Sequence, residues 1–496
     1  MIENKEQTRA LVIPKWLSNK AVRESKDYEI PQEKQFIIRS SIRDNFNKDY
    51  REFKNNPSPT LAGDILSSAI TLDEKHIATE VAEYLYSYPN TISVTHDLAG
   101  KILGKPISPA TIPKPNNLIH QLKQTLHRHP KNPLAWIELA RIYTTKGQTQ
   151  KAERAVIAAI NLAPSDRFIV RAAFRFYVHM HDYEKAFYYV KKGVNFSADP
   201  WLRATEINAA ILNDNKLKNV KKFDPNLIPS NKLFHYSELI ESVGILDLIG
   251  GNSRKAKKNF KIAWADPSEN VVAHGEWVIR NYFPSFATDA DLDMGLSSEA
   301  LAWHNYYRLQ LKEALYYARS WILQEPYSTH PFLCASQIAC LIGNPSESIS
   351  LAQEGLIANP DDISLKNNLA FAHLKLNNIG AAKGILDTYP KALSDRDKIF
   401  NLATTGLLNF KKGDIELGRS LYQQSIELSG KIDDRRLMAK ATLHLAIAEL
   451  DAKTEIAVPF AQKALSFSLD ITNPEIVLIS QHIIDRINNI NGSRQK

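Results

Sequence analysis

The densest cluster of side chains that could perform chemistry is the run His179, Met180, His181 and Asp182. Two imidazoles and a carboxylate so close together could bind a metal ion or transfer a proton. The run falls, however, where the pattern of one helix gives way to that of the next. A solvated turn accounts for it without any ligand, so we predict no metal site here.

Motifs that carry catalysis or phosphate binding are missing from the sequence. There is no G-x4-G-K-[ST] or G-x-G-x-x-G loop, no H-E-x-x-H pair and no G-x-S-x-G elbow. The two cysteines, Cys334 and Cys340, can form neither a disulfide framework nor a zinc knuckle. We therefore expect a non-enzymatic protein without a cofactor, in a reducing compartment such as the cytoplasm. No apolar run is long enough to span a membrane.

The elements that would position functional side chains follow from a repeat, which is clearest between Pro133 and Pro164. Two amphipathic helices are predicted there, separated by Gly147, which can end a helix with a positive φ. Small residues at Ala140 and Ala152 would let the two helices approach closely. Large apolar residues would fill the space between neighbouring hairpins, namely Trp136, Leu139, Tyr143 and Val156.

The same pattern recurs with starts at residues 133, 167, 295, 329, 363 and 399, which lie 34 to 36 residues apart or at about a multiple of that. The spacing W-x2-L-A-x2-Y, then a turn glycine, an alanine and a closing proline, resembles the tetratricopeptide repeat (TPR) family. The resemblance covers roughly Pro133 to Leu469. It implies an all-α fold, a right-handed superhelical solenoid of antiparallel helix hairpins with a helical N-terminal region.

Composition divides the chain into six predicted regions. Residues 1–60 read as a polar arm and linker whose first part could order only on docking. Residues 61–129 read as a helical N-terminal region and 130–270 as a first, basic TPR array. Residues 271–294 read as an irregular insertion and 295–470 as a second TPR array. Residues 471–496 read as a capping helix and tail.

The charge of the chain is uneven, with 40 Lys and Arg against 27 Asp and Glu in residues 1–264 and 22 against 27 in the remainder. The basic first half could face an acidic protein or nucleic acid. A candidate patch for such a partner comprises Lys218, Lys221, Lys222, Arg254, Lys255, Lys257 and Lys258. An ordinary solvated face is the other interpretation of this run.

The family resemblance also implies where a partner would bind, because the first helix of each TPR hairpin lines a concave groove. The positions that make groove contacts in the family correspond to Arg141, Arg171, Arg175 and His179. Arg171 and Arg175 are four residues apart and share a helix face, from which they could bind a carboxylate or phosphate. Solvated arginines or ion pairs with nearby acids are the alternative.

Two functions fit these features. The first is a scaffold or adaptor whose groove holds a peptide or helix of another protein. The second is a nucleic-acid-associated subunit that binds RNA or DNA through its basic half. If the groove arginines bind the partner directly, Arg171→Glu with Arg175→Glu should abolish binding and lower the thermal midpoint by only a few degrees.

Overall fold

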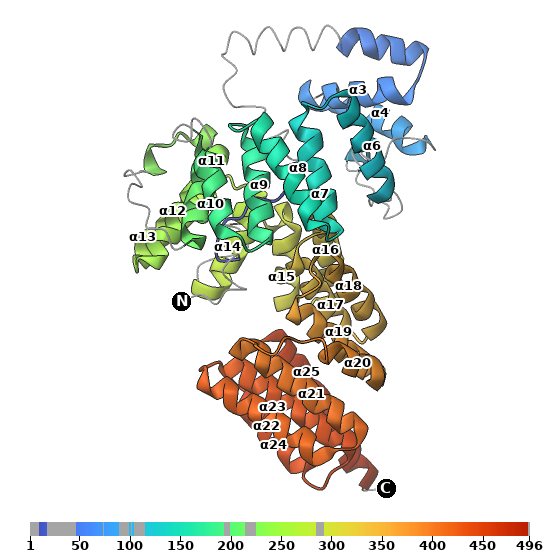
Figure 1. Ribbon diagram of the computed structural model, residues 1–496, viewed down its shortest axis with the longest axis vertical. Coiled ribbons are helices and arrows are strands. Elements are labelled where there is room, and N and C mark those ends of the chain that lie inside the picture. Colours follow the sequence, from blue (N-terminus) through green and yellow to red (C-terminus); the bar gives the residue numbers. More distant parts are fainter. Residues whose placement is uncertain are drawn as a thin grey trace. The chain divides into compact units, whose positions relative to one another are not determined.

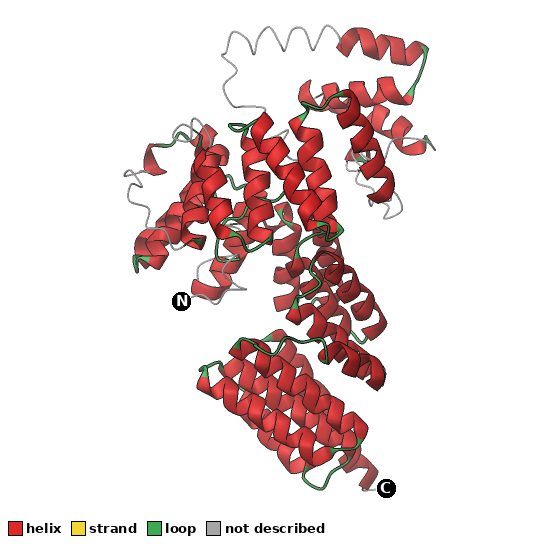
Figure 2. Ribbon diagram, in the orientation of Figure 1, coloured by secondary structure: helices red, strands yellow, loops and turns green. Residues whose placement is uncertain are grey.

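The computed structural model describes residues 9–16, 46–72, 74–88, 99–100, 102–103, 115–192, 199–213, 225–283 and 292–494. Throughout these residues the regular elements are helices, and none of them is a strand (Figure 2). The prediction of an all-α solenoid of antiparallel hairpins is confirmed.

The chain forms two compact units, of which the smaller comprises Ser18–Pro130. It contains α3 (Pro59–Leu72), α4 (Lys75–Ser87), α6 (Pro115–Arg128) and a further helix over residues 46–55. Aromatic and aliphatic side chains from the 46–55 helix, α3 and α4 form its core, including Phe46, Phe53, Leu66, Val81 and Leu85. Tyr50 donates a hydrogen bond of 2.6 Å to Glu80 and so ties the first of these helices to α4.

The larger unit comprises Met1–Leu17 and Lys131–Lys496 and holds the repeats (Figure 1). Its first hairpins are built from α7 (Pro133–Thr145), α8 (Thr149–Leu162), α9 (Arg167–His179), α10 (Tyr183–Lys192), α11 (Pro200–Leu212), α12 (Leu233–Ile249), α13 (Ser253–Ala263) and α14 (Glu269–Tyr282). Short 3-10 turns lie at Pro225–Leu227, Ser230–Lys232 and Met294–Leu296.

The later hairpins continue the same arrangement. They are built from α15 (Ser298–Tyr307), α16 (Leu311–Gln324), α17 (Thr329–Leu341), α18 (Pro345–Ala358), α19 (Ile363–Lys375), α20 (Ile379–Leu386), α21 (Asp395–Lys412), α22 (Ile415–Lys431), α23 (Arg435–Ala452) and α24 (Ala457–Ser468). The last helix, α25 (Pro474–Arg494), packs against α23 and α24 through Ile476, Ile479, Ile483 and Ile487.

Capping side chains and turn residues set where the helices of each hairpin begin and end. Side-chain oxygens cap several first helices, as where Asn132 accepts from the Ala135 amide at 3.1 Å and Asp166 from the Ile169 amide at 3.0 Å. The turns between paired helices contain a residue with φ between 54° and 90°, which recurs 34 residues apart from Gly147 to His181 and again from Leu309 to Asn377 through Gly343. This recurrence is the structural form of the sequence repeat.

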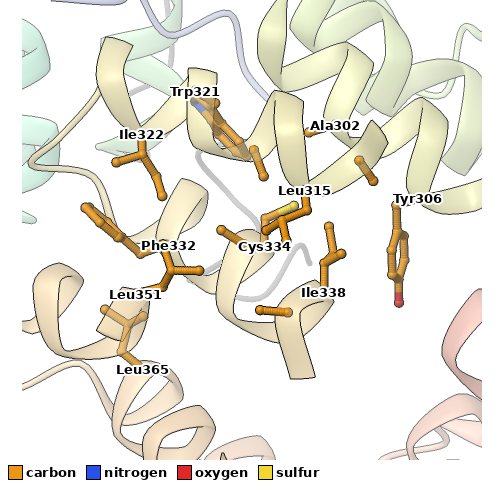
Figure 3. Close-up of a cluster of buried hydrophobic side chains, with 14 residues drawn as sticks. Ala302, Tyr306, Leu315, Trp321, Ile322, Phe332, Cys334, Ile338, Leu351 and Leu365 are labelled. Atoms are coloured by element: carbon orange, nitrogen blue, oxygen red, sulfur yellow. The ribbon is translucent and has the colours of Figure 1, made fainter. Parts of the chain in front are cut away.

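Interlocking side chains between neighbouring hairpins form the core of the unit. Figure 3 shows one such cluster, in which Trp321 and Ile322 of α16 lie among residues of α15 and of the helices that follow. Phe332 and Cys334 of α17 and Leu351 of α18 belong to it and are at most 9% exposed. No single hairpin could bury these side chains alone, so each repeat depends on its neighbours.

Two segments differ from their predicted description. Residues 269–282 form the helix α14, although the insertion predicted for 271–294 was expected to be irregular. Its N-cap, Ser268, accepts from the Val271 amide at 3.4 Å, and its buried face includes Val271, Val272 and Val278. In addition, residues 9–16 of the predicted polar arm are packed within the repeat unit.

Candidate functional site

The N-terminal segment, residues 9–16, lies against the first helices of successive hairpins. Its contacts come from α9, α11, α14 and α15, together with the end of α16. Val12 is 1% exposed and Trp16 is fully buried. Residues 9–11 form a turn and a bend, and residues 12–16 have no regular secondary structure. The backbone groups of the segment therefore need partners from the surrounding helices.

Three side chains of the repeats bind this backbone directly. The Asn208 amide on α11 donates to the Val12 carbonyl at 2.9 Å. The Asn270 carbonyl oxygen on α14 accepts from the Lys15 amide at 3.2 Å. His274, one turn further along α14, lies with Nε2 at 3.2 Å from the Ala10 carbonyl oxygen. These three contacts recognise the main chain of the segment, independently of its side chains.

A buried pair stands behind one of these contacts. Since a carbonyl oxygen can only accept, His274 Nε2 carries a hydrogen, and its Nδ1 faces Glu241 Oε1 at 2.7 Å. Burial raises the pKa of the Glu241 carboxyl, while His274 and the Trp264 indole oppose this effect. A proton between Nδ1 and Glu241 Oε1 joins the two groups and holds the imidazole in place.

The cationic side chains of the segment meet carboxylates of the repeats. Arg9 lies 3.4 Å from Glu299 and 3.7 Å from Glu276, with its guanidinium 4.5 Å from the centre of the Trp303 ring. The Lys15 ammonium lies 3.0 Å from Glu269. Burial lowers the pKa of Lys15, and Glu299 and Glu325 oppose that shift. The groove is therefore complementary to a positively charged segment.

Trp16 is the apolar anchor of the segment. Its ring packs edge-on against Phe176 of α9, with centroids 6.2 Å apart, and is tilted against Tyr327 at 5.6 Å. Full burial of an indole between two aromatic rings contributes both transfer free energy and a ring-to-ring attraction of about 0.5–1.5 kcal/mol per pair.

Alternate side chains of the segment leave part of the groove open. Arg9, Leu11, Ile13 and Lys15 line a cavity of about 130 Å³ together with residues of α9, α14 and the start of α17. The polar groups around the cavity include His179, Thr329 and His330.

The predicted groove residues Arg171 and Arg175 lie on the inner face of α9, but their charges are paired within the chain. Arg171 binds Glu238 of α12 at 2.8 and 3.0 Å, and Arg175 binds Glu325 at 3.0 and 3.2 Å. Burial would raise the pKa of Glu325, but Arg175 and Lys15 outweigh it and hold this pKa below its usual range.

These ion pairs support the groove from behind. Glu238 also accepts from Asn270 at 2.7 Å, and Arg175 lies 5.1 Å from the centre of the Tyr327 ring that packs on Trp16. Both arginines are less than 9% exposed. In place of a mild effect, we now expect charge reversal at both positions to destabilise the repeat unit, because it would place carboxylates beside buried carboxylates.

The other two predicted groove residues differ from each other. Arg141 is half-buried and pairs with Glu138, one turn earlier on α7. The His179 ring packs edge-on against Tyr327 at 5.6 Å. Burial lowers the pKa of His179 to about 3, and Arg175 adds to the effect. Its imidazole is neutral at physiological pH and adds no positive charge to the groove.

The candidate basic patch is described only in part. Lys218, Lys221 and Lys222 lie outside the described residues. On α13, Arg254, Lys255 and Lys258 are exposed, with Lys255 paired to Asp247 at 3.0 Å. Lys257 is half-buried, with its ammonium 5.8 Å from the centre of the Phe283 ring.

Sequence reasoning missed the residues that hold the N-terminal segment. Asn208 lies in a repeat whose sequence departs too far from the pattern to be recognised. Asn270 directly precedes the insertion predicted for residues 271–294, and His274 lies within it. A usable signal existed in the arm itself. An apolar run, Leu11–Ile13, followed by Pro14 and Trp16 is unusual in a polar segment and favours extended backbone.

Comparison with known proteins supports the interpretation of the repeats. Residues 134–166 match the model of the tetratricopeptide repeat. Solved structures similar to the chain include the Cut9–Hcn1 hetero-tetramer of APC/C, at 13% identity and a TM-score of 0.39, covering 90% of this chain and 88% of that one. Yeast Tom70 is similar at 11% identity and a TM-score of 0.30, covering 88% and 96%. These TM-scores are too low to support a functional comparison with either structure. No curated protein matches the chain in sequence.

Residues 134–166 thus contain a tetratricopeptide repeat, which lies in a longer series of antiparallel helix hairpins. Such repeats generally serve as protein-interaction scaffolds. Within the part of the chain that the structure describes, no helix is long and apolar enough to cross a membrane. The same residues include no group of three or more His, Cys, Asp or Glu side chains placed to hold a metal ion.

Proposed function

We propose that this protein is a non-enzymatic interaction scaffold whose TPR groove holds an extended segment of a partner protein. The observation that supports this is the mode in which residues 9–16 are held. Asn208, Asn270 and His274 bind backbone groups of a non-helical chain, and carboxylates flank its cations. A surface with these properties suits a peptide in preference to a helix, whose backbone groups are already paired.

Site-specific photocrosslinking in the native host tests this function. A photoreactive amino acid at Thr329, which lines the open part of the groove, should capture a partner protein that mass spectrometry identifies. The matched control carries the same amino acid at Lys258, on the exposed face of α13. Capture from Thr329 and not from Lys258 supports the scaffold. Capture from Lys258 alone, or from neither position, contradicts it.

The exposed cations of α13 keep a second function open, that of a nucleic-acid-associated subunit. Arg254 and Lys258 present positive charge to solvent, as a phosphate contact requires. Binding of labelled RNA or duplex DNA would weaken steeply between about 50 and about 200 mM salt and would fall with Arg254→Glu plus Lys258→Glu. Absence of binding at the lower salt concentration eliminates this function.

A further inference from the structure

We propose that residues 9–16 are an intramolecular ligand that occupies the partner groove, and that a partner segment with the same chemistry displaces it. The proposal rests on the proposed scaffold function and specifies the class of partner. That class is an extended peptide with an arginine, a short apolar run and a Lys-Trp pair. The corresponding residues here are Arg9, Leu11–Ile13, Lys15 and Trp16.

The repeats hold residues 9–16 through specific polar contacts. In the buried part of a repeat unit, apolar side chains alone would suffice to fill space. Here the segment is instead recognised through both its main chain and its charges, as Asn270 binds the Lys15 amide and Glu269 the Lys15 ammonium. These contacts are the ones by which an interface selects a peptide.

Residues 9–16 are also far in sequence from the repeats that hold them. It belongs to the repeat unit, yet the 113 residues of the other unit, Ser18–Pro130, separate it in sequence from the first repeat at Lys131. It is therefore a ligand attached to its groove through an intervening domain. Such attachment gives it a high effective concentration at the groove, against which a partner must compete.

Residues 9–16 do not fill the groove. The cavity of about 130 Å³ beside Arg9, Leu11, Ile13 and Lys15 borders the segment along its length. An incoming peptide can contact Thr329 and His330 there before the segment leaves. Displacement can therefore proceed stepwise, with the new ligand entering as the old one departs.

The test uses a fluorescein-labelled peptide with the sequence of residues 8–17 and the full-length chain. A protease site inserted between Leu17 and Ser18, where one unit ends and the other begins along the chain, allows the segment to be cut free with its side chains unchanged. After cleavage the labelled peptide should exchange into the groove, with an apparent affinity at least about tenfold higher than for the intact chain.

A second variant, Trp16→Ala, weakens the attached segment and leaves the groove intact. It should bind the labelled peptide about a hundredfold more tightly than the wild-type chain does, because loss of a buried tryptophan shifts the population toward the open groove. Circular dichroism confirms that the variant is folded. A peptide with alanine in place of tryptophan is the matched control and should not bind.

A charge cycle identifies the site. In the Trp16→Ala chain, Glu299→Gln should weaken the arginine-containing peptide several-fold and leave a peptide with glutamine at that position unaffected. If neither the cleaved chain nor the folded Trp16→Ala chain binds the peptide, the segment is a fixed structural strap and the proposal fails.

The proposal would also be overturned if the intact wild-type chain bound the labelled peptide as tightly as the cleaved and Trp16→Ala chains do. A stable dimer that exchanges N-terminal segments between copies would overturn it as well. Photocrosslinking from Thr329 tests the scaffold function independently. A captured partner without peptide exchange would refute the intramolecular ligand alone.

Discussion

Single residues in the groove act through buried charge pairs. Arg171 and Glu238 are 4% and 1% exposed, and the same carboxylate holds Asn270, which in turn binds the N-terminal segment. A pair of this kind contributes little net stability compared with apolar residues of equal volume, because desolvation offsets the attraction. Its importance is that neither member can be lost alone.

Arg171→Met should therefore destabilise the repeat unit by about 3–5 kcal/mol, since Glu238 would remain buried without its cation. Urea unfolding followed by circular dichroism measures the loss. The double variant Arg171→Met with Glu238→Gln removes the uncompensated charge and should recover most of it. A single variant that loses less than about 1 kcal/mol would contradict the assignment of this pair.

The sequence predicts a shared helix face for these residues but cannot supply their partners. The spacing of four residues puts Arg171 and Arg175 on one face of a helix, and the family resemblance assigns that face to the groove. Their partners lie 67 and 150 residues away in sequence. Only the winding of the repeats brings Glu238 and Glu325 to this face, so spacing within a single repeat carries no trace of the pairing.

Within elements, close helix approach depends on glycine where α21 and α22 cross. A Cβ at Gly418 would lie 2.6 Å from the Phe410 ring and 2.9 Å from the Gly406 carbonyl oxygen. A backbone atom cannot move aside as a flexible side chain can. The hairpin α21–α22 thus tolerates no side chain at this position.

Gly418→Ala should lower the free energy of unfolding by about 1–3 kcal/mol through overpacking. The matched control is Gly384→Ala on α20, where a Cβ would meet no atom within 4 Å. That change should instead stabilise by about 0.5–1 kcal/mol, because alanine is the better helix former. Equal effects of the two substitutions in urea titrations would show that the close approach is not present.

The terminal helix α25 is attached through a charge cluster at its first turn. Glu475 pairs with Lys440 of α23 and accepts a 3.0 Å hydrogen bond from Gln337 of α17. Burial alone would raise the pKa of Glu475, but Lys440 and His444 outweigh it and lower this pKa to about 2. The carboxylate therefore favours the folded state wherever it is ionised.

Acidification should release this contribution. The pKa is lowered from 4.5 to about 2 on folding, so the stabilisation is complete above pH 4.5 and is lost as the pH falls toward 2. The loss amounts to about 3 kcal/mol and should be absent in Glu475→Gln. Hydrogen exchange of α25 at pH 5 and at pH 2.5 measures it, and equal pH dependence in the two proteins would refute the cluster.

Hairpin boundaries were the most predictable elements, because turn residues recur 34 positions apart in both arrays and caps such as Asn132 and Asp166 precede the first helices. The helix α14 escaped prediction for a physical reason. Its buried face carries polar residues, among them Asn270, His274 and Glu276, which pair with the N-terminal segment and with other helices. These polar side chains lie among buried apolar ones such as Val271, Val272 and Val278, so the apolar stripe that marks a helix in a sequence is interrupted.

At the scale of the whole repeat unit, the N-terminal segment joins the two predicted arrays. It contacts α9 and α11 of the first and α15 of the second, and Arg175 of α9 reaches Glu325 at the end of α16. The turn after α7 also approaches α18, since a Cβ at Gly147 would meet the Ile357 carbonyl oxygen. A linear repeat pattern predicts neighbours in the stack and not these contacts between distant repeats.

The proposals above require residues 9–16 to lie in the groove, and photocrosslinking from position 16 tests this placement. A benzoylphenylalanine that replaces Trp16 in the full-length chain should crosslink to peptides containing Phe176 and Tyr327. In a mixture of isotopically light and heavy chains, these crosslinks should join only peptides of the same isotope. Crosslinks elsewhere, or between light and heavy chains, would contradict the account.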